Sequence, residues 1–451
     1  MTAMSTLEIL HWNDIHGRWA ALARLSARAR AIRTAADHPV LLLDGGDVEE
    51  GSIRISALTK GVAGWRLLGA ADVDAAAVGN GGLLRYGPDV LPAYAEALRS
   101  APLVCDVDLD GSAPVGAARS RVASSGSVAV GVIGATDYYP QYDEFGLVER
   151  GRVTAVRAEA DMLRRQGVDV VVLLSHCGLN ADIALSWALR HKVDLIVGGH
   201  SHDALDEGDL SHGVPIVQAG CYGERLGRVT LDISDGGVEV VDVCHEVAAD
   251  DWPADPAVLD ELAACERDLE AWLAEPLAVL GEPVSWQELN DSAIARLVIE
   301  ALLASHPGDV GMLIAGHCTA GLPAGTLSRG DVWEAISSPG NAATASVPGE
   351  VLRVMIEKGV SEEYATTVPR TFRGRPYGTL HLVGAEVRDG EVYVAGTPVV
   401  RHRSYRVTGS DLELSTYGLL VADEPDDLVV HTPVILPELL ERHLAERDPG
   451  E

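Results

Sequence analysis

The chain has 451 residues, 47% of them hydrophobic and 23% charged, which is typical of a globular protein large enough for two domains. Its formal net charge of −32 argues against nucleic acid as a partner, since an acidic surface repels phosphate backbones. The sequence shows no secretory signal, no apolar stretch long enough to cross a bilayer and no C-x-x-C pair among its six cysteines, so we expect a cytoplasmic protein with reduced thiols and no membrane partner.

The first predicted strand is followed by a polar motif. Leu7, Ile9 and Leu10 are apolar and predict a short buried strand, after which Asp14 and His16 follow with one residue between them. An isolated D-x-H pattern has an ordinary interpretation, in which the aspartate opens a turn. Residues i and i+2 at the end of a strand can also point to one side and converge on a cation. The motif alone therefore does not distinguish a turn from a metal site.

Strand-like and helix-like segments then alternate through the first half of the chain. Continuous β-branched runs separated by helical segments indicate sheets that are covered by helices on their faces. Strands are expected within residues 39–47, 73–82, 127–137, 168–178, 193–202 and 214–234, and helices within residues 19–36 and 154–166.

A change of composition marks the boundary between two expected domains. Residues 250–280 begin with Pro and Asp and continue as a long acidic amphipathic helix, which we interpret as a linker. The expected organisation is a first domain over residues 1–249, this linker, and a smaller α/β domain over residues 281–451.

Polar residues recur where the apolar runs of the first domain end. They are Asp14, His16, Asp47, Asn80, His176, His200 and His202. In open α/β sheets, sites assemble at the carboxyl ends of the strands, and glycine beside most of these residues lets the backbone approach closely. Each residue alone has an ordinary interpretation as a loop residue, but their recurrence at five strand ends favours a metal site.

This ordered set resembles that of the dinuclear metallophosphoesterases. The blocks that carry the resemblance are ILHWNDIHG, LLLDGGD, VVVLLSHCGL, DLIVGGHSH and VPIVQAGCYGERLGRV, and they extend over nearly all of residues 7–234. More narrowly, the chain resembles the 5'-nucleotidase family, in which such a domain precedes a C-terminal substrate-binding domain. The resemblance implies an α/β fold with an N-terminal β-sandwich flanked by helices, a linker helix and a smaller C-terminal α/β substrate domain.

The resemblance also implies two divalent metal ions, for which the mixed nitrogen and oxygen ligands suit Mn, Zn or Fe. It assigns the first ion to Asp14, His16 and His202, the second to Asn80, His176 and His200, and the bridge between them to Asp47. Two cations about 3.5–4 Å apart lower the pKa of a bridging water, which then attacks phosphorus in line.

The third block departs from the family pattern. The family reads GNHEFD or close to it, whereas residues 79–87 read GNGGLLRYG. Asn80 is kept, but the histidine that polarises the phosphate or protonates the leaving group is replaced by Gly81. The aspartate partner of that histidine aligns with Leu84. The catalytic dyad is therefore missing while the metal ligands are kept.

The expected substrate domain departs from the family as well. In the substrate loop of residues 315–332, the usual arginine aligns with Thr319. The aromatic residue of the family's PF.N block is Gly340, next to Asn341, and the terminal aromatic block has decayed to STYGLL, with Tyr417 as the nearest aromatic residue. Base stacking is worth about 1–3 kcal/mol per base, so the loss of both aromatic contacts argues against ordinary nucleotides.

Several residues are candidates to replace what is missing. His317 in the substrate loop, or Arg85 beside the vacated position, is expected to supply the catalytic group. Arg373 and Arg375, in RGRPYGTLHLVGAEV, are candidates to hold an anionic part of the substrate, with solvated surface arginines as the alternative. The remaining candidate substrate contacts are Asn80, Asn341 and Tyr417.

These features predict a metal-dependent phosphomonoester hydrolase that uses a metal-bridging hydroxide. Its expected substrate is a small, specialised phosphorylated metabolite or a modified nucleotide in the cytoplasm. The alternatives are a conventional 5'-nucleotidase, a non-catalytic phospho-ligand-binding protein and a hydrolase of a related sulfur ester.

Overall fold

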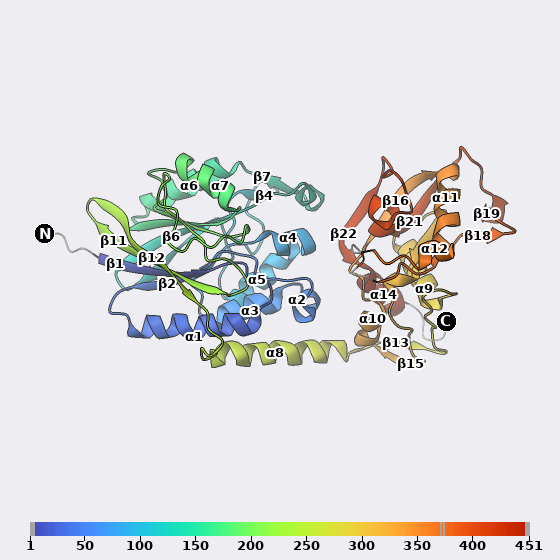
Figure 1. Cartoon of the computed structure of the whole chain (residues 1–451), viewed down its shortest axis with the longest axis horizontal. Helices are drawn as coiled ribbons and strands as arrows, with labels where there is room; N and C mark the ends of the chain where they lie inside the picture. The colour runs from blue at the N-terminus through green and yellow to red at the C-terminus, as the bar shows by residue number, and fades with distance from the viewer. Residues whose placement is uncertain (1–4, 370–371, 373–374, 447–451) are drawn as a thin grey trace. The chain divides into compact units, whose positions relative to one another are not determined.

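The computed structural model describes residues 5–369, 372 and 375–446 and divides into two compact units, whose elements are labelled in Figure 1. Unit 1 ends at Leu269 and unit 2 begins at Glu270, so the division falls inside the long helix α8 (Pro256–Leu273). This helix lies within the expected linker, whose last residues instead form strand β13 (Pro276–Leu280).

Unit 1 is built around two five-stranded sheets. The first sheet has the order β12-β11-β1-β2-β3, and its strands are β1 (Ser5–Trp12), β2 (Val40–Asp44), β3 (Ala75–Ala76), β11 (Arg225–Ser234) and β12 (Gly237–Val247). The second sheet has the order β10-β9-β8-β6-β5, and its strands are β5 (Ser120–Ser125), β6 (Val128–Thr136), β8 (Val170–His176), β9 (Leu195–Gly198) and β10 (Ile216–Val217). Strands β6, β8, β9 and β10 run parallel to one another, so their carboxyl ends meet at one edge.

The core of unit 1 lies between the two sheets. Successive side chains of a strand point to opposite faces, and Val172 and Leu174 of β8 pack in one cluster with Ile9 of β1. Leu173, which lies between them, packs on the other face of its sheet in a cluster with Leu163 of α6. This alternation explains why the β8 run is apolar throughout.

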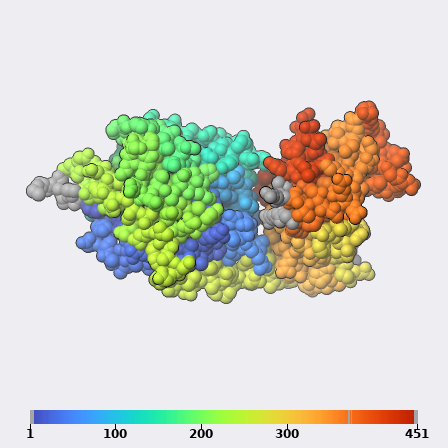
Figure 2. All heavy atoms as spheres, in the orientation of Figure 1, coloured from blue at the N-terminus to red at the C-terminus, as the bar shows by residue number. Residues whose placement is uncertain are grey.

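Helices and short turns complete unit 1, and Figure 1 shows helices on both outer sides of the paired sheets. They are α1 (Trp19–Ala35), α2 (Arg54–Leu58), α3 (Val62–Ala70), α4 (Asn80–Tyr86), η1 (Pro88–Val90), α5 (Leu91–Leu98), η2 (Pro140–Phe145), α6 (Arg152–Arg165) and α7 (Leu179–Ala188), with a small strand pair β4 (Val107–Leu109) and β7 (Leu147–Glu149). On the surface shown in Figure 2, segments near both ends of unit 1 lie side by side, as the bidentate pairing of Arg28 with Glu246 also shows.

Unit 2 is a mixed sheet of order β17-β14-β21-β16-β22 with helices on both faces. Its strands are β14 (Val310–Ile314), β16 (Asn341–Pro348), β17 (Leu380–Val383), β21 (Ser404–Ser410) and β22 (Val429–Ile435). Its helices are α9 (Ala293–Ser305), η3 (Ala315–His317), α10 (Arg329–Ala335), α11 (Gly349–Gly359), α12 (Glu362–Ala365), α13 (Asp411–Leu414), η5 (Thr416–Gly418) and α14 (Leu436–Ala445). Smaller sheets pair β13 with β15 (Gly325–Ser328), and β18 (Ala385–Arg388) with β19 (Glu391–Val394) and β20 (Thr397–Pro398).

The predicted fold class is confirmed, since the chain is a mixed α/β protein with paired sheets flanked by helices and a second α/β unit. One expected strand is much shorter than predicted. Of residues 73–82, only Ala75 and Ala76 form a strand, and Asn80 opens helix α4. Among the described residues, no helix is long and apolar enough to span a membrane.

Candidate metal centre

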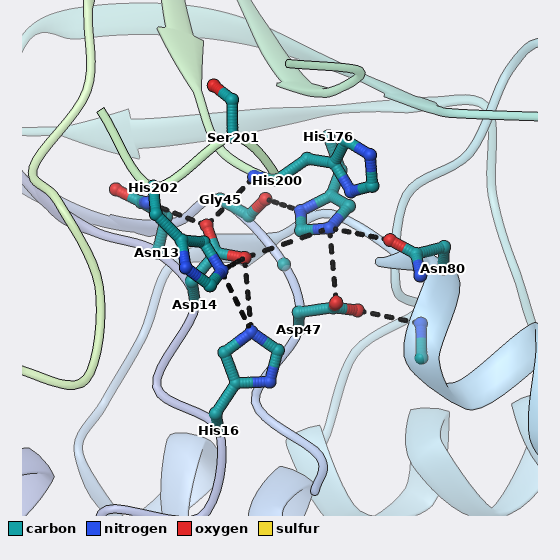
Figure 3. Close-up of polar contacts among 12 residues, drawn as sticks. Asn13, Asp14, His16, Gly45, Asp47, Asn80, His176, His200, Ser201 and His202 are labelled. Carbon is teal, nitrogen blue, oxygen red and sulfur yellow. Dashed lines mark hydrogen bonds and ion pairs between the residues drawn. The ribbon is translucent and has the colours of Figure 1, made fainter. Parts of the chain in front are cut away.

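The seven predicted metal ligands lie together at the carboxyl ends of strands from both sheets of unit 1 (Figure 3). Their places are Asp14 and His16 after β1, Asp47 after β2, Asn80 at the start of α4, His176 at the end of β8, and His200 and His202 after β9. The structure therefore brings residues that are up to 188 positions apart into one cluster, as the strand-end pattern predicts.

One group of predicted ligands converges beside Asp14. His16 Nε2 and His202 Nε2 lie 3.2 Å apart, and they lie 3.4 Å and 3.3 Å from Asp14 Oδ1. Two neutral imidazole nitrogens at this distance share at most one hydrogen, whereas a cation placed among the three atoms accepts a lone pair from each. The three side chains therefore form a group that is able to hold a metal ion.

Asp14 also belongs to a second group, with Asp47 and His176. His176 Nε2 lies 3.3 Å from Asp47 Oδ2, 3.2 Å from Asn80 Oδ1 and 4.0 Å from Asp14 Oδ1. The carboxylate that both groups share is thus Asp14, and the bridging role of Asp47 stays a prediction.

The two oxygens of Asp14 have different environments, although the whole side chain is buried. Oδ2 accepts hydrogen bonds from Asn13 Nδ2 at 2.7 Å and from the backbone nitrogen of His200 at 2.8 Å. Oδ1 is buried and accepts no hydrogen bond from any residue that the structure describes, although two imidazole nitrogens lie 3.3 Å and 3.4 Å away. A buried polar atom without a partner costs about 1–3 kcal/mol, and more when it is charged. Because this oxygen faces the imidazole nitrogens of both groups, the residues present fit a bound cation.

The ring of His176 is oriented by the backbone of the neighbouring sheet. Its Nδ1 lies 2.8 Å from the carbonyl oxygen of Gly45, so Nδ1 donates there and Nε2 faces the carboxylates. Burial lowers the pKa of His176, but Asp47 and Asp14 raise it by more, to about 10. A metal ion at this place would displace the proton that the carboxylates attract to Nε2.

His200 lies at the edge of the cluster. Its side chain is 26% exposed, and its Nε2 lies 3.9 Å from Asp137 Oδ2 and 3.4 Å from the hydroxyl of Tyr139. Neither metal-ligand group among the described residues includes it, so its assignment to the second ion stays a prediction. Burial and the neighbouring His176 lower the pKa of His200, which favours the neutral ring that a metal requires.

Two glycines at the start of α4 lie directly against Asp47. A Cβ atom at Gly79 would lie 2.0 Å from Asp47 Oδ1, so only glycine fits at this position. A Cβ atom at Gly81 would lie 3.1 Å from the same oxygen, and the backbone nitrogen of Gly81 donates to it at 2.8 Å. A side chain at position 81, where the family pattern has histidine, would therefore begin close to the Asp47 carboxylate.

The predicted replacements for that histidine lie in different environments. Arg85 is exposed and lies against the backbone of Gly51 in the loop after Asp47. His317 is 1% exposed in unit 2, where its Nε2 lies 3.1 Å from both Glu413 Oε1 and the Ser410 hydroxyl. Burial this complete favours a structural role, because His317 would have to become exposed before it met a substrate. Its catalytic role stays an untested prediction.

The predicted substrate contacts of unit 2 are also placed by the structure, except Arg373, which lies outside the described residues. Arg375 donates to the carbonyl oxygens of Gly316 and Cys318 at 2.8 Å and 2.9 Å, so its guanidinium holds the substrate loop together. Asn341 donates to the carbonyl of Val434, and Tyr417 is 67% exposed. Their roles in substrate binding stay predictions.

Sequence reasoning missed four residues at the centre. Asn13 orients Asp14, and Asp137 and Tyr139 lie beside His200. Tyr222 packs against His16 and His202, with ring centroids 5.7 Å and 5.5 Å away. The strand-end rule would have found Asp137 and Tyr139, since they lie at the end of the predicted strand of residues 127–137 and just beyond it.

Comparisons with known proteins match two separate parts of the chain. Residues 7–204, which contain all seven predicted ligands, match the calcineurin-like phosphoesterase family, and residues 277–418 match the 5'-nucleotidase C-terminal domain. The chain is 25% identical over 435 residues to an uncharacterized metallophosphoesterase, YunD, of Bacillus subtilis, covering 92% of this chain and 93% of that protein.

Other similarities extend to 5'-nucleotidases. The human 5'-nucleotidase is 27% identical over 276 residues, which are 51% of this chain and 47% of the human protein, so the match spans about half of that relative. The structure of a 5'-nucleotidase precursor from Thermus thermophilus superposes with a TM-score of 0.53 at 20% identity, covering 98% of this chain and 96% of that one. At this identity, the likeness supports the fold alone.

Proposed function

We propose that the chain is a phosphomonoesterase with a specialised substrate, because it matches the calcineurin-like phosphoesterase family over residues 7–204 and the 5'-nucleotidase C-terminal domain over residues 277–418. The substrate is a small phosphorylated metabolite or modified nucleotide rather than a common nucleotide, and two divalent ions, of Mn, Zn or Fe, take part. The six cysteines, none of which forms a disulfide, support a cytoplasmic location, where thiols are kept reduced.

The observation that carries this proposal is the unpaired Oδ1 of Asp14. It is buried, and it is shared by two groups of ligands that contain His16 and His202 on one side and Asp47 and His176 on the other. Divalent ions bound there supply Lewis-acid activation of water and charge neutralisation at the phosphoryl oxygens. The mixed nitrogen and oxygen donors fit such ions.

The chain's own residues hold the parts of this reaction in place. The backbone nitrogen of Gly81 fixes one oxygen of Asp47 at 2.8 Å, and the other oxygen faces His176 at 3.3 Å. The amide oxygen of Asn80 lies 3.2 Å from His176 Nε2, so its amide nitrogen is left to orient a phosphoryl oxygen. The partly exposed rings of His16, His200 and His202 mark the side from which a substrate enters.

The absence of a side chain at Gly81 supports an unusual substrate. General acid help in a transition state is worth about 10²- to 10⁴-fold, and the family pattern places that group where this chain has glycine. A substrate with a good leaving group, or a donor from another position, compensates for this loss. The exposed Tyr417 and the glycine at position 340 are likewise unlike the paired aromatic contacts expected for a nucleobase.

The test is phosphate release by the metal-loaded full-length protein from a panel of phosphomonoesters, with nucleoside 5'-monophosphates included. We expect turnover of at least one non-nucleotide ester or modified nucleotide with a kcat/KM at least about tenfold above that for any common nucleotide. Preference for common nucleotides would identify a conventional 5'-nucleotidase. Binding of phosphate esters by calorimetry without release of phosphate would identify a binding protein, and either outcome would overturn the proposal.

A further inference from the structure

The loop after β6 brings a phenol to the edge of the metal centre. Strand β6 lies beside β8 in register, so that Thr136 pairs with His176. Three residues later, the hydroxyl of Tyr139 lies 3.4 Å from His200 Nε2. Tyr139 is partly exposed, and so is His200 beside it.

Packing fixes the position of this phenol. The Tyr139 ring lies edge-on to His200 and to Tyr142, with centroids 6.4 Å and 6.0 Å away, and Tyr142 is fully buried. The turn η2, which follows Tyr139, contacts α4, and a Cβ atom at Gly87 would lie 2.9 Å from the ring of Phe145 in that turn. The loop is therefore anchored on the helix whose first turn carries Asn80 and Gly81.

The centre lacks a side-chain donor at position 81, and Tyr139 offers one from the neighbouring loop. The hydroxyl group of a phenol can donate its hydrogen in a hydrogen bond. We propose that Tyr139 donates a hydrogen bond to the leaving-group oxygen of the substrate. This assignment rests on the proposed phosphoester hydrolysis.

In the step concerned, the oxygen of a water forms a bond to phosphorus while the bond from phosphorus to the leaving oxygen breaks. The attacking water gives up one proton to solvent. The leaving oxygen keeps the electron pair of the broken bond and takes up one proton from solvent, so the products are an alcohol and inorganic phosphate with no net change in protons. The hydrogen bond from Tyr139 stabilises the charge on that oxygen before it is protonated.

Leaving-group dependence tests this role. In Tyr139→Phe, loss of one preorganised donor should lower kcat by about 10²-fold on glycerol 2-phosphate, whose alkoxide leaving group is strongly basic. The same variant should lose at most about threefold on 4-nitrophenyl phosphate, because nitrophenolate needs little stabilisation. Tyr138→Phe is the matched control, since that phenol bonds to Asp143 and to the carbonyl of Leu147, and we expect it to leave both rates unchanged.

Two further measurements separate this role from a structural one. Tyr139→Phe should bind the same number of metal ions per chain as the wild type, and its Tm should change by no more than about 2 °C. Equal loss on both esters, no loss on either, or loss of metal would overturn the assignment and leave the proposed function intact. Wild-type protein that releases phosphate from neither glycerol 2-phosphate nor 4-nitrophenyl phosphate, nor from the wider panel, would overturn both.

Discussion

Replacement of Asp14 by asparagine tests the metal centre at the atom on which it depends. The substitution keeps the size and shape of the side chain but removes its charge. Asn13 Nδ2 and the backbone nitrogen of His200 are both donors, so the amide oxygen of the new side chain would have to take the place of Oδ2. The amide NH₂ would then take the place of the unpaired Oδ1 and point its hydrogens at His16 and His202.

The size of the effect follows from the sharing of Asp14 between the two ligand groups. Each group has three members, so each loses one of its three ligands and one negative charge. Changes to groups that only orient a ligand already lower metal affinity by about 10- to 100-fold. Loss of a shared ligand should therefore lower affinity by more than about 100-fold, or about 2.7 kcal/mol.

The assay is metal content by elemental analysis after dialysis, together with binding isotherms against a competing chelator. Asp44→Asn is the matched control, because Asp44 is as fully buried, also has one oxygen without a partner and belongs to neither ligand group among the described residues. The control should keep the wild-type metal content. If Asp14→Asn binds metal as tightly as the wild type does, the site has been placed wrongly.

Three further variants test other parts of the structure. In Gly79→Ala, the new methyl group would lie 2.0 Å from Asp47 Oδ1, so we expect a loss of about 1–3 kcal/mol in urea unfolding together with a loss of bound metal, and unchanged values would contradict the close approach. Burial and a neighbouring histidine lower the pKa of His11 from 6.5 in the unfolded chain to about 3. Its contribution to stability is therefore complete above pH 6.5 and is lost as pH falls toward 3, at about 1.4 kcal/mol per pH unit. His11→Phe should remove this part of the slope of unfolding free energy between about pH 6 and 4, and an unchanged slope would refute the assignment. His317→Ala removes one of the groups beside the buried carboxylate of Glu413, which keeps its hydrogen bonds from the backbone nitrogens of Ile314 and Ser410. We expect a cost of about 1–3 kcal/mol in unfolding free energy, whereas a loss of turnover at unchanged stability would favour the catalytic role predicted from the sequence.

The strands that carry the site can be predicted because a continuous run of apolar residues indicates a buried strand. Residues 168–178 and 193–202 contain long apolar runs, since β8 and β9 are covered on both faces, and both strands form within those ranges. Residues 73–82 are rich in alanine and glycine, which have weak strand propensity, and only two of them pair. The order of strands within each sheet depends on contacts between distant parts of the chain, which local patterns do not record.

The sequence does not show which groups each side chain of the site contacts. A sequence shows that Arg375 carries a charge, but it does not show that its guanidinium donates hydrogen bonds to two backbone carbonyl oxygens. His317 has a residue type and a loop position that suggest catalysis, and only the folded structure reveals the buried carboxylate of Glu413 beside it. Tyr139 follows a predicted strand, which marks it as a possible site residue, but the sequence does not show that its hydroxyl lies beside His200.

The sequence also does not show the backbone conformation at the predicted ligands, which sets the direction of their side chains. Five predicted ligands have left-handed backbones, with φ between 45° and 74°, and they are Asp14, His16, Asp47, His200 and His202. Such a conformation costs about 1–3 kcal/mol at a residue other than glycine and persists only where the surroundings enforce it. Here the loops after β1 and β2 enforce it on each other, since the backbone nitrogens of residues 14 and 16 donate to the carbonyls of residues 46 and 47. The predicted ligands of these two loops, Asp14, His16 and Asp47, are thus held in direction by hydrogen bonds of the polypeptide itself.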